Sequence, residues 1–361
     1  MKILLLCTDS YGGHGGIALY NRDLAEALAA RSDVDEVIVV PRVIRSEVGS
    51  VPPKITFQAD AAKGPAQYLR AVMRARRAKP DLVICGHMNL LPVACTLARN
   101  PLLMIYGIEA WKHSGSPLVN RLLHRARAII SISAITRDRL LAWSKYRGKT
   151  FLLPNAIHAE QYGIRVKRAD LVARYQLEGK RVLLTVGRLA EEERYKGFDE
   201  VLEILRDLPE DVVYMIAGGG NDAVRLQQKA AHLGLGNRVV FTGLFSEAEK
   251  PDVYALADVY VMPSRGEGFG YVFLEALASG VPVIGSKHDG GREALLDGDL
   301  GLLVDPANPA EIVAAIREIL GRPRERVIPP KLENFSYENF KERLSAITDS
   351  EGRTQSAEGR S

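Results

Sequence analysis

The stretch "ADVYVMPSRGEGFGYVFLEALASGVPVIGS", residues 257–286, contains a complete strand–turn–helix–strand pattern. An apolar run ends at Pro263, the glycine-rich turn "RGEGFG" follows, and "YVFLEALASG" has the composition of a helix. Gly280 and Pro282 are typical of a helix end, and the apolar "VPVIGS" indicates a second strand. Two buried strands joined by a helix favour a parallel β-α-β unit, so this stretch predicts an α/β protein.

The same alternation of apolar runs and helix-like stretches extends over most of the chain. Continuous Val, Ile and Leu runs are typical of strands buried on both faces of a parallel sheet. A polar stretch, 158–180, separates two such series, so we predict two Rossmann-like α/β domains with a cleft between them. The expected strands are at 2–8, 34–41, 79–86, 101–107, 127–133 and 149–155, then at 181–189, 211–220, 237–244, 257–264, 281–286 and 301–306.

The pattern also predicts where the domains end. We expect a first domain at 1–157 and a second at 158–335. A helical pattern follows at 336–348, with Ser336 as its N-cap. The remaining stretch, 349–361, is polar and poor in apolar residues, so we expect it to be disordered.

Composition narrows the class of protein. The chain has 361 residues, which is long for one core, and it is 47% hydrophobic and 25% charged, as in water-soluble proteins. We find no apolar run of the roughly 18–20 residues that a membrane-spanning helix needs, and the apolar start is too short for a secretory signal. The three cysteines, Cys7, Cys85 and Cys95, form no Cys-x-x-Cys pattern. These features predict a cytoplasmic protein without a disulfide framework or a zinc site.

The positive charge is concentrated in the first half of the chain. Residues 63–79 include six basic side chains and no acidic one, and residues 117–149 include eight basic side chains against Asp138 alone. Two interpretations stay open: a solvated basic face, or a surface for anionic lipid at the inner face of a membrane or for a polyanionic acceptor. Nucleic acid is disfavoured, because the chain has no helix-turn-helix, zinc-finger or RNA-binding signature.

A glycine-rich turn, "YGGHGGIALY", lies between the first expected strand and a helix from about residue 16 to residue 30. Glycines such as Gly15 and Gly16 allow a close approach of the backbone, and the helix start presents free N–H groups to an anion. A simple tight turn is the alternative. The turn also fits the loose dinucleotide pattern G-x-G-x-x-A, but Pro41 and Arg42 stand where that pattern needs an acid, so an NAD site is disfavoured.

Two cations follow the first strand of the second domain, in "VGRLAEEERYKGFDEVLEIL". Arg188 comes directly after the strand, and Lys196 comes eight residues later at a helix start. A diphosphate is a suitable partner, because arginine binds it bidentately and lysine acts as a point charge. Pairing with the glutamates at 191–193 explains the same residues, and spacing alone does not separate the two interpretations.

Two glutamates, Glu267 and Glu275, flank the turn and helix of the opening stretch. Backbone N–H groups around residues 268–271 would lie at a helix N-terminus, which favours an anion site. A glycosidase pair needs carboxylates about 5–9.5 Å apart. Eight residues of continuous helix would separate them by roughly 12 Å, so a hydrolase is disfavoured. We expect separate roles, with Glu267 reaching a ligand and Glu275 accepting hydrogen bonds from ribose hydroxyls.

Several motifs in order resemble the retaining glycosyltransferases of family 4, which have the GT-B fold. The motifs are "GGHGGIALY", "LPNAIH", "VGRL…KG", "AGGG…NRVVFTG" and the opening stretch, in which Glu267 and Glu275 match the family's E-x7-E motif; together they cover about 1–345. The resemblance implies an acceptor-side first domain, a nucleotide-sugar donor domain at 158–335 and a helix at 336–348 that crosses back to the first domain. It implies the following roles: Arg188 and Lys196 hold the diphosphate, Gly15, Gly16 and Gly218 approach the donor, Glu275 holds the ribose, and Glu267 with the backbone of Phe269, Gly270 and Tyr271 faces the sugar.

The sequence departs from the family in one segment. Many relatives have a histidine in an "HGIE"-like segment, whereas "MIYGIEAW" places Tyr106 there. The polar contact from the first domain could then come from Glu109, His113 or His87, each of which also fits a structural role.

What the resemblance implies is a retaining transfer of a hexosyl unit from GDP-mannose or a UDP-hexose, by front-face attack without a protein nucleophile. The acceptor would be a glycan or lipid-linked molecule in bacterial polysaccharide or glycoconjugate synthesis. Because no Asp-x-Asp motif is present and two cations are available, we expect no metal and no cofactor. A GT-B sugar-nucleotide epimerase and a non-catalytic sugar-nucleotide binder are the alternatives, and an NAD(P)-dependent oxidoreductase is a more distant one.

Overall fold

The computed structural model describes residues 1–323 and 325–358, with side chains as far as residue 351. The described chain divides into two compact units: Met1–Ala156 together with 337–358, and Ile157–Ser336. We call these unit 1 and unit 2. The breaks expected from the sequence, after residues 157 and 335, lie one residue from these positions.

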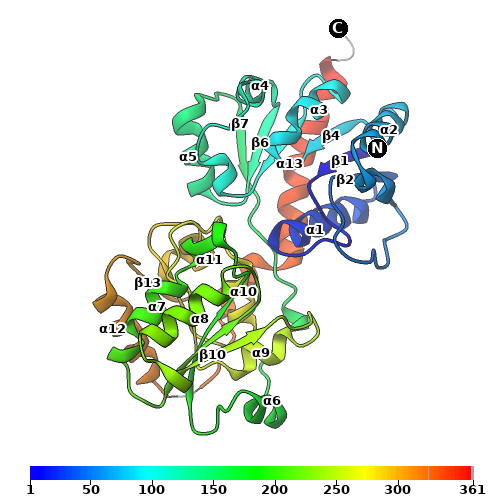
Figure 1. Ribbon diagram of the computed structural model, residues 1–361. Coiled ribbons are helices and arrows are strands. Elements are labelled where there is room, and N and C mark those ends of the chain that lie inside the picture. The colour runs from blue at the N-terminus through cyan, green and yellow to red at the C-terminus, as the bar shows by residue number, and fades with distance from the viewer. Residues whose placement is uncertain (324, 359–361) are drawn as a thin grey trace. The chain divides into compact units, whose positions relative to one another are not determined.

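Unit 1 is built on a seven-stranded parallel sheet with the strand order β3-β2-β1-β4-β5-β6-β7 (Figure 1). Its central strands are buried on both faces, as their continuous apolar runs predict. The order reverses between β1 and β4, where ligands commonly bind at the carboxyl ends of parallel strands. The strands are β1 (Lys2–Cys7), β2 (Glu36–Pro41), β3 (Ile55–Phe57), β4 (Leu82–Cys85), β5 (Leu102–Ile105), β6 (Ala128–Ser131) and β7 (Lys149–Leu152).

Helices cover this sheet and provide the other half of its core. The helices are α1 (Gly16–Ala30), α2 (Pro65–Arg77), α3 (Leu91–Leu97), α4 (Pro117–Leu122), α5 (Ala134–Ser144) and α13 (Tyr337–Glu358). On one face, Leu4, Leu6 and Val83 of the sheet pack in a core with Ala71 and Ala75 of α2. Small residues on the inner face of α2 allow the helix to lie close to the strands.

Unit 2 repeats the architecture with a six-stranded parallel sheet in the order β10-β9-β8-β11-β12-β13. The strands are β8 (Arg181–Val186), β9 (Val212–Ala217), β10 (Val239–Gly243), β11 (Val259–Val261), β12 (Val283–Ser286) and β13 (Leu302–Val304). The helices are α6 (Ala169–Arg174), α7 (Phe198–Ile204), α8 (Ala223–His232), α9 (Lys250–Leu256), α10 (Tyr271–Ala278), α11 (Gly291–Ala294) and α12 (Pro309–Leu320). Two parallel α/β units confirm the predicted fold class, and the β11-α10-β12 segment confirms the pattern in the opening stretch.

The C-terminal helix corrects one prediction. The sequence suggested a helix at 336–348 and disorder at 349–361, but α13 continues to Glu358 and belongs to unit 1, where it packs against α1 (Figure 1). Within this polar stretch one charge meets partners: Glu351 is buried, 2.9 Å from Lys149 Nζ and 3.3 Å from Arg127 Nε. The expectation is wrong for 349–358, and 359–361 lie outside the described residues.

None of the helices described in unit 1 or unit 2 is both long enough and apolar enough to cross a lipid bilayer.

Candidate functional site

The end of β8 brings the two predicted phosphate-binding cations onto one carboxylate. Arg188 lies two residues beyond β8, and Lys196 ends the 3₁₀ segment η6 (Glu191–Lys196). Arg188 Nη2 contacts Glu193 Oε1, and Lys196 Nζ lies 3.1 Å from Glu193 Oε2. The Arg188 side chain is 66% exposed, whereas those of Lys196 and Glu193 are 14% and 11% exposed. Of the three adjacent glutamates, the structure therefore selects Glu193 as the partner of both cations.

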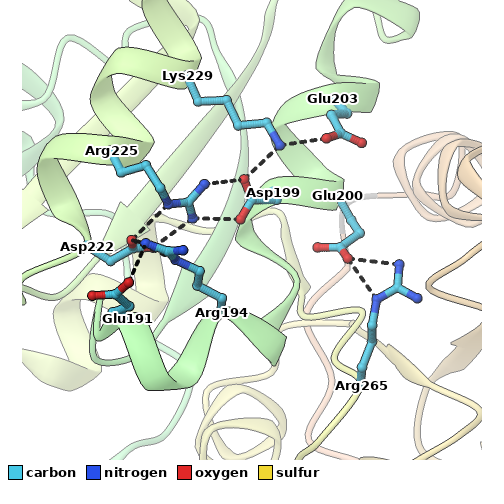
Figure 2. Close-up of polar contacts among 9 residues, drawn as sticks. All are labelled: Glu191, Arg194, Asp199, Glu200, Glu203, Asp222, Arg225, Lys229 and Arg265. Atoms are coloured by element: carbon cyan, nitrogen blue, oxygen red, sulfur yellow. Dashed lines mark hydrogen bonds and ion pairs between the residues drawn. The ribbon is translucent and has the colours of Figure 1, made fainter.

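A network of ion pairs fixes η6 to the neighbouring helices of unit 2 (Figure 2). Asp222, which is buried, accepts hydrogen bonds from Arg194 Nε and Nη2 at 2.9 and 2.8 Å. Arg225 also donates to Asp222, and it bridges to Asp199 of α7, which in turn contacts Lys229 of α8 (Figure 2). Hydrogen bonds from Arg225 and Arg194 hold the pKa of Asp222 below its ordinary value. The segment that carries Glu193 and Lys196 is therefore tied to two helices.

Gly218 lies where the end of β9 passes the end of β8. Its φ is +142°, and a β-carbon built on it would lie 2.0 Å from the carbonyl oxygen of Gly187. Glycine is thus required here by the contact between two backbone segments of unit 2. The predicted contact of Gly218 with a donor stays a prediction.

The loop before α10 is joined directly to η6. Arg265 N–H donates to the carbonyl oxygen of Tyr195 at 2.7 Å, and a β-carbon on Gly266 would lie 2.9 Å from the Tyr195 ring. Because β8 and β11 are neighbours in the sheet, their carboxyl ends meet here. The structure therefore brings Glu267 to the same edge of unit 2 as Arg188 and Lys196.

Asp289 is a buried residue of this loop region that the sequence analysis missed. Its carboxylate accepts hydrogen bonds from Ser264 Oγ at 2.6 Å, from Glu267 N–H at 2.9 Å and from Gly291 N–H at 3.0 Å. Burial raises the pKa of Asp289 to about 7, although these hydrogen bonds act against the rise. The available signal was an aspartate just after β12, at the sheet edge that already held Glu267.

Glu275 lies on the inner side of α10 and is buried. Its Oε2 accepts a hydrogen bond from Tyr254 OH at 2.7 Å, and its Oε1 lies 3.1 Å from Lys250 Nζ. Burial acts to lower the pKa of Lys250, but Glu275 and Glu247 outweigh it and raise the pKa above its ordinary value. Glu275 is thus held by a tyrosine and a lysine of α9.

The three residues at the start of α10 have different environments. Phe269 is buried and packs edge-on against Phe335, with ring centroids 5.4 Å apart. Gly270 caps the helix with a φ of +99°, and Tyr271 is its first residue. The predicted helix start after the glycine turn is confirmed, whereas contact of these residues with a sugar stays a prediction.

The glycine turn of unit 1 is open. Gly15 caps α1 with a φ of +87°, and a β-carbon on it would meet no atom within 4 Å. Gly16 begins the helix, and both glycines are exposed. Backbone conformation rather than crowding therefore explains glycine at position 15.

Tyr106, at the end of β5, is buried and engaged within unit 1. Its hydroxyl donates to Asn21 Oδ1 of α1 at 2.7 Å, and its backbone N–H donates to Glu109 Oε1 at 2.6 Å. His87, after β4, accepts a hydrogen bond from Asn89 N–H at 3.1 Å. Burial lowers the pKa of His87, and the nearby Glu109 counteracts part of this shift. Tyr106, Glu109 and His87 are therefore brought together at neighbouring strand ends.

His113, the remaining candidate of this segment, lies elsewhere. Its ring packs on Trp143 of α5, with centroids 4.5 Å apart, so its visible role is packing.

Residues 1–323 and 325–358 were compared with the side-chain groupings that bind metal ions. No group of three or more His, Cys, Asp or Glu side chains there is placed to hold a metal ion. Metal independence stays a prediction, because the site residues alone do not test it.

Family models match both halves of the chain. The model "Glycosyltransferase Family 4" matches residues 14–161, and "Glycosyl transferases group 1" matches residues 168–341. Together they span nearly all of units 1 and 2.

Relatives and solved structures agree with this match. A GDP-mannose-dependent alpha-(1-6)-phosphatidylinositol monomannoside mannosyltransferase of Mycolicibacterium smegmatis is 32% identical over 57% of this chain, which spans 56% of that relative. A phosphatidyl-myo-inositol mannosyltransferase of Mycobacterium leprae is 27% identical over 89% of this chain and 87% of its own. The structure of Anabaena HepE in complex with UDP-glucose superposes with a TM-score of 0.78 at 22% identity, covering 97% of this chain and 100% of that one.

The chain spans about half the length of the first two relatives that it matches. The structural likeness shows the fold, and the family models cover both units. With its two parallel α/β units of the GT-B type, the chain belongs to the family 4 glycosyltransferases.

Proposed function

We propose that this glycosyltransferase moves a hexosyl unit, with retention, from a nucleotide-diphosphate sugar to a glycan or lipid-linked acceptor in bacterial polysaccharide or glycoconjugate synthesis. The observation that carries the proposal is the meeting of Arg188, Lys196 and the Glu267 loop at one edge of unit 2. Breaking the bond to a sugar leaves negative charge on the diphosphate. Cations that are already in place at that edge would stabilise this charge in the transition state.

The other residues have roles that follow from their positions. The N-terminus of an α-helix favours negative charge, and α10 begins directly after Gly270. Glu275 already accepts a hydrogen bond from Tyr254, but each carboxylate oxygen can accept more than one. It could therefore accept from ribose hydroxyls while Tyr254 and Lys250 keep it in place. Transfer would proceed by front-face attack, without a protein nucleophile, a metal or a cofactor.

The donor that we propose is GDP-mannose or a UDP-hexose. The named activities of the mycobacterial relatives support mannose on GDP, and the ligand of Anabaena HepE supports glucose on UDP. The acceptors in the names of the two mannosyltransferases are phosphatidylinositol lipids, which supports a lipid-linked acceptor. A cytoplasmic protein that works at the inner face of a membrane would meet such an acceptor.

Helix α2 supports the membrane part of the proposal. Leu69 and Met73, one turn apart on its outer face, are 62% and 42% exposed. Arg70, Arg76 and Arg77 flank them and have no acidic partner among the described residues, whereas Arg74 pairs with Asp60. Apolar side chains between arginines suit the boundary of an anionic lipid layer. Sedimentation with vesicles should retain the protein on anionic lipid at low salt, and retention equal to that on neutral lipid would contradict this part.

Nucleotide binding tests the donor site first. We would titrate GDP, UDP, ADP and NAD(P), without metal, into the native protein and into Lys196→Gln and Glu275→Gln variants, following the melting temperature. Selective stabilisation by one nucleoside diphosphate, weakened in both variants, is expected. Stabilisation by NAD(P) alone, or by none of them, would overturn the proposal.

Turnover then separates the alternatives. With the matching nucleotide-sugar, release of the nucleoside diphosphate that depends on acceptor supports a transferase. Conversion of the sugar without release would indicate an epimerase, and binding without any turnover would indicate a non-catalytic binder.

A further inference from the structure

We propose that Glu193 is the internal counterion of Arg188 and Lys196, that an incoming diphosphate displaces it, and that it thereby weakens the binding of donor and product alike. The inference rests on the proposed function, because it assumes that these two cations receive the diphosphate. It goes beyond that function in naming the protein group with which the ligand competes.

The contacts of Glu193 place it where the ligand's negative charge is expected. One carboxylate oxygen faces Arg188 and the other faces Lys196 at 3.1 Å, so a single carboxylate bridges the two cations. Two linked phosphoryl groups offer the same arrangement of negative oxygens. A diphosphate on these cations would lie within ion-pair distance of the carboxylate, and like charges this close repel. One anion is therefore expected to replace the other.

Glu193 is also incompletely satisfied in the free protein. Its Oε2 is buried and accepts no hydrogen bond from any described residue, so its contact with Lys196 is an ion pair alone. A buried acceptor without a hydrogen bond is uncommon and requires an explanation. An exchangeable counterion provides one, because the carboxylate gains solvent contacts when it leaves.

The position of Lys196 does not depend on Glu193 alone. Lys196 lies over Gly187, since a β-carbon on that glycine would be 3.4 Å from both Cδ and Nζ of the lysine. The 3₁₀ segment is held by Arg194 on Asp222, which does not involve Glu193 (Figure 2). Arg188 is largely exposed, so its link to Glu193 is the weak, screened kind. Removing the Glu193 charge should therefore leave Lys196 in place and leave Arg188 without a competing carboxylate.

The test is calorimetric titration of GDP, UDP and inorganic pyrophosphate into the native protein and into Glu193→Gln. We expect the dissociation constant to fall about tenfold, as for the loss of one competing charged hydrogen-bond partner. Pyrophosphate should show the same gain, because the competition concerns phosphate and not the base. Glu193→Asp, which keeps the charge but shortens the reach, should give a smaller gain and serves if Glu193→Gln does not fold.

Glu192→Gln is the matched control, because Glu192 is an exposed neighbour and the charge change is the same. It should change the dissociation constant less than twofold, since exposed charges contribute little. In a protein that already contains Lys196→Gln, Glu193→Gln should lose much of its effect, because the more buried of its two ion pairs is already gone. Equal or weaker binding by Glu193→Gln, or an equal gain in Glu192→Gln, would overturn the inference. Binding that does not depend on Lys196 would instead overturn the proposed donor site.

Discussion

The carboxyl edges of the two sheets hold their predicted residues in different ways. In unit 2 they form ion pairs. Arg188 and Lys196 both pair with Glu193, and Glu275 pairs with Lys250. In unit 1 the ties involve no cation: Tyr106 donates to Asn21, and Glu109 and His87 accept from backbone N–H groups. Fixed charges stabilise developing charge without reorganisation, whereas neutral hydrogen bonds mainly fix shape. The comparison therefore predicts that substitutions of these ion-paired residues in unit 2 affect catalysis, whereas substitutions of these hydrogen-bonded residues in unit 1 affect stability.

Lys196→Gln should have the largest effect. Loss of one preorganised electrostatic group typically lowers turnover by about 10²–10³-fold. The measurement is release of the nucleoside diphosphate from the matching donor at saturating acceptor. Lys331→Gln is the control, because Lys331 is an exposed lysine of unit 2 paired with Asp299, and it should stay near native activity. A loss below threefold in Lys196→Gln would break the contrast between the two edges.

Asp289→Asn should change the pH dependence of stability. The pKa of Asp289 is raised from 3.8 to about 7, so the folded protein holds this proton where the unfolded chain has lost it. Stability contributed by this group is therefore present at low pH and declines as pH rises from about 4 to 7, by up to about 1.4 kcal/mol per pH unit. The asparagine variant should lack this decline in urea unfolding measured across that range.

Asp222 provides the opposite case within the same unit. Its pKa is lowered by Arg225 and Arg194, so its contribution is present at neutral pH and is lost as pH falls below its ordinary value of 3.8. In Asp222→Asn the unfolding free energy should therefore fall less steeply below about pH 4 than in the native protein. Between pH 4 and 7 its pH dependence should be unchanged. If the two variants changed stability over the same pH range, the assignment of the Asp289 pKa would be wrong.

Tyr106→Phe sharpens the comparison from the side of unit 1. Removing the hydroxyl leaves the buried Asn21 Oδ1 without its donor, which should cost about 1–3 kcal/mol of unfolding free energy. Nucleotide affinity should stay within twofold of native. Phe340→Leu tests packing on the same Tyr20–Tyr106 cluster without removing a hydrogen bond. Loss of nucleotide binding in Tyr106→Phe at unchanged stability would contradict the structural role.

How far the sequence predicted this molecule depends on the kind of signal. Apolar runs are local, and they predicted both sheets except β3, the break between the units to within one residue, and the start of α10 at Tyr271. Motif order identified Arg188, Lys196 and Glu267, which the fold then brought to one edge. Which of three adjacent glutamates pairs with a cation cannot be read from the sequence. The backbone of η6 places Glu193, and not its two neighbours, in the interior. The role of Asp289 was not predictable from a local pattern, because two of its three partners are 22 and 25 residues away in the chain.

The end of α13 shows the same limit, and it provides the prediction with the smallest effect. Polar composition suggested disorder after residue 348, yet Glu351 is buried against Arg127 and Lys149, at the amino ends of β6 and β7. Glu351→Gln should loosen only the last turns of the helix, because α1 still covers its earlier part. Amide hydrogen exchange should therefore rise at 349–351 and stay native at 340–347. Exchange that rose along the whole helix would mean that this single carboxylate holds α13 on unit 1, and that the ion pairs of unit 1 matter as much as those of unit 2.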